Sequence, residues 1–125
     1  MNRAMFPKAR VAAIVALAWA ASFPASAHHQ FLQKAFPAAK SHASAVSEVR
    51  LVFDGKADAL FSTMRLRKAD GSVVAEITQP EASREMVLPT PTLSQGKYLV
   101  EYRVLATDGE IVKGDFFFTV GNDRT

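Results

Sequence analysis

The chain has 125 residues, no cysteine, and 15 Lys and Arg against 12 Asp and Glu, a formal net charge of +3. Three of the basic residues lie in the first ten positions, so the rest of the chain carries 12 charges of each sign and offers nothing to attract nucleic acid. The lack of cysteine excludes disulfide cross-links and thiolate ligands, so any metal site must use nitrogen, oxygen or thioether donors.

The beginning of the chain has the three regions of a cleavable export signal. A basic segment without any acidic residue precedes a largely apolar stretch of thirteen residues, 11–23. A membrane-spanning helix needs about 20 apolar residues, so this run is too short for an anchor. Ala25 and Ala27 supply the small side chains that signal peptidase requires before the cleaved bond. We therefore expect a signal peptide at residues 1–27 and a periplasmic domain at residues 28–125, with no membrane insertion after cleavage.

The mature segment alternates between polar and apolar residues and contains no amphipathic helix. Seven short runs of strand-forming residues are separated by turn signals at intervals near ten residues. These runs are residues 31–36, 48–53, 64–67, 73–77, 85–88, 97–105 and 115–120. Asp54 and Gly55 predict a turn after the second run, and Asp70 and Gly71 predict a hairpin between the third and the fourth.

The number and spacing of these runs favour a single all-β domain, a seven-stranded antiparallel Greek-key β-sandwich of the immunoglobulin-like kind. A small closed barrel is the alternative, because the sequence does not fix which strands pair. Every second residue from Tyr98 to Val104 is apolar, so this face of the strand is expected to be buried. We expect residues 54–62 to form a loop or one helical turn that carries Ala59, Leu60 and Phe61 inward.

A histidine pair, His28 and His29, directly follows the predicted cleavage site. A free α-amine beside an imidazole offers two nitrogen donors that can close a chelate ring around one metal ion. The amine releases its proton readily to a strong Lewis acid at neutral pH. An idle, exposed terminus is the alternative interpretation. The third histidine, His42, lies in a polar connection and is expected to be a solvated loop residue.

Four groups of residues follow one another along the mature segment in a characteristic order and spacing. They are a post-signal histidine with Leu32 and Pro37, Val49-x-Leu51-x-Phe53, Leu93-x-x-Gly96-x-Tyr98-x-Val100-x-Tyr102-Arg103-Val104, and Asp108-Gly109-x-x-x-x-Gly114-x-Phe116-x-Phe118-x-Val120. Together they resemble the CopC family of periplasmic copper-binding and copper-resistance proteins. The resemblance covers nearly the whole mature segment and implies a seven-stranded β-sandwich, in agreement with the strand count.

The resemblance also implies a Cu(II) site. In the family this site uses the amine and imidazole of the N-terminal histidine together with an Asp-x-His motif before the last strand. The chain has the aspartate, Asp108, but Glu110 stands where the family has its second histidine. Imidazole usually binds Cu(II) more strongly than carboxylate does, so the change should weaken or alter the site. We expect one Cu(II) ion per chain, held by His28, His29, Asp108 and Glu110.

The first residue of the mature chain has two candidates. Counting back from Leu32 and Pro37, the first residue of the family falls on His29, whereas the small-residue rule for cleavage places it on His28. Signal peptidase disfavours an imidazole next to the cleaved bond, so we expect His28 to carry the amine. His29 can then supply the nitrogen that the loop lacks because of Glu110.

These residues predict a monomeric Cu(II) carrier or buffer in copper homeostasis and resistance, and not an enzyme. The resemblance implies an inner-membrane copper importer or another periplasmic copper protein as the partner. Met64 and Met86 are the only methionines of the mature segment, so we expect no Cu(I) site and interpret both as core residues.

Two other functions remain open. The first is a metal-free β-sandwich that serves as an interaction module. In this case Glu110 would reflect the loss of the full copper site. A copper oxidase with an N-terminal histidine brace would need a further histidine, and His42 is the only distant candidate.

Overall fold

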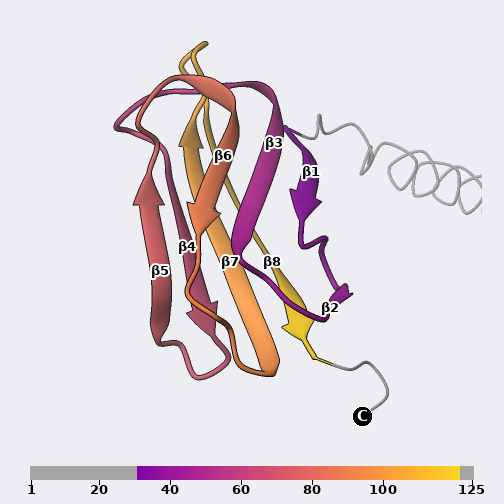
Figure 1. Cartoon of the computed structure of the whole chain (residues 1–125). Helices are drawn as coiled ribbons and strands as arrows, with labels where there is room; N and C mark the ends of the chain where they lie inside the picture. The colour runs from indigo at the N-terminus through magenta and orange to yellow at the C-terminus, as the bar shows by residue number, and fades with distance from the viewer. Residues whose placement is uncertain (1–30, 122–125) are drawn as a thin grey trace, which may run out of the picture.

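The computed structural model describes residues 31–121, which form eight strands in two packed sheets (Figure 1). One sheet has the order β1-β3-β6 and the other has the order β2-β8-β7-β4-β5. The strands are β1 (Leu32–Phe36), β2 (His42–Ala43), β3 (Glu48–Ala57), β4 (Thr63–Lys68), β5 (Val73–Thr78), β6 (Ser83–Pro89), β7 (Gly96–Leu105) and β8 (Ile111–Val120). The predicted all-β sandwich is confirmed, with one more strand than expected. The predicted signal peptide lies outside the described residues, and within them no helix could cross a membrane.

The additional strand is β2, which pairs in parallel with the end of β8. His42 lies opposite Thr119, and the backbone nitrogen of Thr119 donates to the carbonyl oxygen of Ser41 at 2.9 Å. His42 is exposed, as expected, but lies in a strand instead of a loop. A strand of two residues is too short to show an alternating pattern, so the sequence gives no sign of it.

The turn predicted at Asp54 and Gly55 is wrong, because β3 continues through both residues to Ala57. Tertiary hydrogen bonds keep this part of the strand paired. The backbone nitrogen of Asp54 donates to the carbonyl oxygen of Phe31 at 2.7 Å, and that of Thr107 donates to the carbonyl oxygen of Lys56 at 3.2 Å. These long-range partners override the local preference of Asp-Gly for a turn.

The hairpin predicted at Asp70 and Gly71 is confirmed and joins β4 to β5. Gly71 has a φ of +92°, a conformation that side chains other than glycine rarely adopt. The Asp70 carboxylate accepts hydrogen bonds from the backbone nitrogen of Ser72 at 2.9 Å and from its hydroxyl at 2.7 Å. Because these bonds favour the charged form, they lower the pKa of Asp70.

The core lies between the two sheets and is built from the alternating faces of the strands. Its fully buried members include Val49, Leu51, Phe53, Met64, Leu66, Met86, Leu88, Val100, Val104 and Phe118. Met64 and Met86 are both 0% exposed, which agrees with their interpretation as core residues. On the face of β7 that was predicted to be buried, Tyr98, Val100 and Val104 are buried and Tyr102 is half-buried. Each large apolar side chain that leaves water in this way stabilises the fold by about 1.5–3 kcal/mol.

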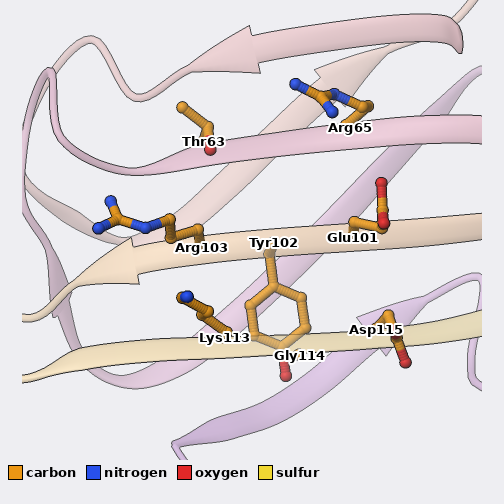
Figure 2. A pocket seen from close by; sticks show the side chains of 8 residues that line it. All are labelled: Thr63, Arg65, Glu101, Tyr102, Arg103, Lys113, Gly114 and Asp115. Carbon is orange, nitrogen blue, oxygen red and sulfur yellow. The ribbon is translucent and has the colours of Figure 1, made fainter.

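Tyr102 on β7 lies across Gly114 of the neighbouring strand (Figure 2). Its ring centre is 5.9 Å from that of Phe53, which in turn stacks on Phe31 with ring centres 5.2 Å apart. A Cβ atom added to Gly114 would meet the Tyr102 ring well inside van der Waals distance. Burial, followed by the nearby charge of Asp115, raises the pKa of Tyr102. Gly114 therefore makes the space in which Tyr102 packs.

The connection between β3 and β4 contradicts the expectation that Leu60 and Phe61 point inward. Their side chains are 72% and 60% exposed, whereas Ser62 is fully buried. The Ser62 hydroxyl accepts a hydrogen bond from the backbone nitrogen of Leu105 at 3.0 Å. The side chain of Ser62, and not that of Leu60 or Phe61, therefore points into the domain. Leu60 has a φ of +71°, in the left-handed region, and its backbone nitrogen donates to the carbonyl oxygen of Gln79 at 2.9 Å.

Candidate metal centre

Asp108 and Glu110 lie in the tight turn between β7 and β8, and both are exposed. The backbone nitrogen of Gly109 donates to the carbonyl oxygen of Ala106 at 2.8 Å, and that of Ala106 donates to the carbonyl oxygen of Glu110 at 2.8 Å. Oδ1 of Asp108 accepts a hydrogen bond from the backbone nitrogen of Glu110 at 3.0 Å. Asp108 therefore holds the turn through one oxygen, and a carboxylate has further acceptor sites for another partner.

The turn lies beside the point where the described chain begins. Phe31 is hydrogen-bonded through its backbone to Asp54, and Thr107 is hydrogen-bonded in the same way to Lys56. Asp54 and Lys56 are alternate residues of β3, so their backbone polar groups face the same edge of the strand. Two residues of a strand span about 7 Å. The residue after Thr107 is Asp108, so this turn and the start of β1 lie at the same end of the sandwich (Figure 1).

The structure does not bring all the predicted donors together within the described residues. His28 and His29 lie outside them. His42 pairs with Thr119 near the end of β8, whereas the Asp108 turn precedes Ile111 at the start of that strand. Eight residues of strand span about 26 Å, so His42 lies far from Asp108.

Asp108 and Glu110 supply oxygen donors alone. Among residues 31–121, no group of three or more histidine, cysteine, aspartate and glutamate residues is close enough to hold a metal ion. Within the same range, no lysine, arginine or histidine forms an ion pair with either carboxylate. Cu(II) favours a tetragonal arrangement of nitrogen and oxygen donors. The turn therefore offers oxygen donors alone, and a Cu(II) site here would also need nitrogen donors.

Residues 32–121 match the family model of the CopC domain. The chain belongs to the CopC domain family. Among solved structures, CopC from Methylosinus trichosporium OB3b is 37% identical, with a TM-score of 0.68 and coverage of 78% of this chain and 98% of that chain. PcoC, a methionine-rich copper resistance protein from Escherichia coli, is 25% identical, with a TM-score of 0.65 and coverage of 74% and 99%. No curated protein gives a match to the chain.

Membership of the CopC family confirms the resemblance seen in the sequence and connects the chain with a copper-related function. One difference from the Escherichia coli relative bears on the metal chemistry. That protein is described as methionine rich, whereas the described part of this CopC domain contains just Met64 and Met86, both enclosed in the core.

The structure also reveals a shallow hollow of about 480 Å³ on the outer face of the five-stranded sheet, which the sequence analysis missed (Figure 2). It is lined by Thr63, Arg65, Glu101, Tyr102, Arg103, Lys113, Gly114 and Asp115. Arg103 and Lys113 lie directly opposite each other on β7 and β8. The alternating charged residues of these two strands are the signal that could have predicted it, once their pairing was known.

Proposed function

We propose that this CopC-domain protein is a periplasmic Cu(II)-binding protein that acts as a carrier or buffer in copper homeostasis and resistance. The observation that carries the proposal is the placement of the Asp108 turn and the start of β1 on one edge of β3. A metal ion at this end of the sandwich could take oxygen donors from the turn and nitrogen donors from the N-terminus.

The length of the intervening chain supports this ligand set. His28 precedes Phe31 by three residues, which span at most about 10 Å when extended. Phe31 and Thr107 are bonded to positions of β3 that lie about 7 Å apart. The amine and imidazole of His28 and the imidazole of His29 are therefore within reach of Asp108.

Each proposed ligand has a distinct role. The amine and the His28 imidazole form the chelate ring, Asp108 contributes a carboxylate oxygen, and His29 replaces the histidine that the family has at the position of Glu110. Glu110 adds a second carboxylate, and the two negative charges offset part of the charge of Cu(II). Because the amine and the imidazoles must lose protons to bind, apparent affinity should fall as the pH drops below neutral.

The proposal is tested by titrating the mature protein, beginning at His28, with Cu(II) while following the electron paramagnetic resonance spectrum. Mass spectrometry of the exported protein should first establish whether the amine belongs to His28 or to His29. The physiological partner that we propose is an inner-membrane copper importer or another periplasmic copper protein, and we propose that the carrier is a monomer.

Glu110→His should strengthen Cu(II) binding, because it restores an imidazole at a position now held by a weaker donor. We expect the dissociation constant to fall by about tenfold, equivalent to about 1.4 kcal/mol, in a competition titration against a chelator. Glu110→Gln is the matched control, since it keeps the size of the side chain without adding an imidazole, and it should not strengthen binding. Equal affinities for Glu110→His and the wild-type protein would refute the role given to this position.

His29→Ala should weaken Cu(II) binding by about tenfold if His29 compensates for Glu110. The same competition titration measures the change, and the loss of one nitrogen from the hyperfine pattern should accompany it. His42→Ala is the control, because His42 lies at the opposite end of β8 and should leave both the affinity and the spectrum unchanged. An unchanged affinity in His29→Ala would mean that His29 is idle.

A metal-free interaction module is the second candidate function, and Glu110 is the observation that favours it. In that case Asp108 would serve only to hold the turn through its hydrogen bond to the Glu110 backbone. The Cu(II) titration separates the two functions, since the module predicts weak, nonstoichiometric uptake.

A further inference from the structure

One surface at the same end of the sandwich combines exposed apolar side chains with two cations. Leu60 and Phe61 are 72% and 60% exposed, and Ile111 at the start of β8 is 50% exposed. Arg103 and Lys113 are also exposed. We call these five residues the docking face.

The loop that carries Leu60 and Phe61 is anchored at both ends. The backbone nitrogen of Asp58 donates to the carbonyl oxygen of Leu105 at 2.8 Å, and the carbonyl oxygen of Ser62 accepts a hydrogen bond from the backbone nitrogen of Gln79 at 2.8 Å. A left-handed conformation is unfavourable for a residue such as leucine, because its Cβ atom comes too close to the following carbonyl oxygen. The fold thus holds a strained backbone in a fixed position and exposes two large apolar side chains, a combination that is typical of functional surfaces.

Pairing of the strands places the apolar and cationic residues next to one another. Ile111 lies opposite Leu105, whose backbone is bonded to Ser62, the residue after Phe61. Two residues further along each strand, Lys113 lies opposite Arg103. An apolar row therefore borders a cationic row beside the Asp108 turn.

The cationic row forms no ion pair within the described residues, although Glu101 and Asp115 lie opposite each other in the next row of the same face. Elsewhere on this sheet Arg65 pairs with Glu76 at 2.9 Å, and Arg67 pairs with Glu101 at 2.7 Å. In residues 31–121, no carboxylate lies within 4.0 Å of the charged groups of Arg103 and Lys113. Figure 2 shows both side chains extending toward the end of β7 that leads into the turn. Like charges directly opposite each other destabilise a strand pair, which an anionic partner would relieve.

We propose that the docking face binds a protein partner whose apolar contact surface is bordered by carboxylates, and that copper passes between this partner and the Asp108 turn. The copper step rests on the proposed function, whereas docking itself does not. A lipid surface is disfavoured because the mature segment has balanced charge and therefore no excess of basic residues to attract anionic lipids.

The test places a photoreactive benzoylphenylalanine at position 61 of the full chain, expressed in the cells that encode it. Val73 on β5, 49% exposed and outside the docking face, is the matched control position. We expect a cross-link to one copper-binding protein from position 61, none from position 73, and a yield at least fivefold lower when Arg103→Glu and Lys113→Glu are added. The purified partner should then bind the Phe61→Ser protein at least tenfold more weakly than the unmodified protein.

Leu60→Asn keeps the test independent of folding. Asparagine tolerates the left-handed conformation better than leucine, so this variant should be at least as stable and yet lose most of the cross-link. An unchanged cross-link in Leu60→Asn, no product at position 61, or the same product at position 73 would overturn the proposal. A product of two copies of this chain, or a lipid adduct, would also overturn it. An unchanged Cu(II) titration of Phe61→Ser would show that any failure concerns docking and not the metal site.

Discussion

Adding Gly-Ser-Gly-Ser ahead of His28, a length that avoids a new chelate between an amine and a histidine at the third position, is expected to weaken Cu(II) binding by about 100-fold, equivalent to about 2.8 kcal/mol. The extension converts the α-amine into a peptide nitrogen and so removes a nitrogen donor and the chelate ring that it closes with the His28 imidazole. The remaining imidazoles and the carboxylates of Asp108 and Glu110 would bind the ion without this ring. A competition titration against a chelator of known affinity measures the change.

The control for this prediction is the same Gly-Ser-Gly-Ser extension after Thr125, which should leave the Cu(II) affinity of the mature protein unchanged. The two extended proteins have identical composition, so a difference between them isolates the terminal amine. If both bind Cu(II) as tightly as the mature protein, the amine is not a ligand and the proposed site is wrong.

Gly114→Ala is expected to lower the free energy of unfolding by about 1–3 kcal/mol, the usual cost of overpacking a core. The new methyl group would occupy the space of the Tyr102 ring, so the ring must leave its contact with Phe53. Urea denaturation of the mature protein without copper measures the loss.

A double-mutant cycle gives the control for this prediction. In a Tyr102→Leu background the clash is absent, so Gly114→Ala should cost much less than it does beside tyrosine. An equal cost in both backgrounds, or an unchanged free energy of unfolding in Gly114→Ala alone, would show that Tyr102 does not determine the requirement for glycine.

The long strand β7 could be predicted because one of its faces is largely buried. On β7 the side chains of Tyr98, Val100 and Val104 alternate with more exposed residues, and this alternation is visible in the sequence. The extension of β3 through Asp54 and Gly55 could not be predicted in the same way. It depends on hydrogen bonds to segments distant in sequence, and the local pattern of residues does not indicate these bonds.

The candidate site is likewise only partly predictable from the local sequence. The turn that presents Asp108 and Glu110 follows from local chemistry, because Asp-Gly favours a tight turn and Gly109 has a φ of +96°. Its position beside the start of β1 follows only from the order of the strands. The exposure of Leu60 and Phe61 was mispredicted because apolar residues are expected inside, whereas the anchored backbone of this loop gives the inward position to Ser62.

The proposed copper site is most directly tested by a Cu(II) titration, followed by electron paramagnetic resonance, of the protein whose first residue is His28. The proposed site predicts one tightly bound ion per chain and a spectrum with hyperfine splitting from nitrogen ligands. Weak uptake without a defined stoichiometry, and a spectrum without nitrogen splitting, would contradict it.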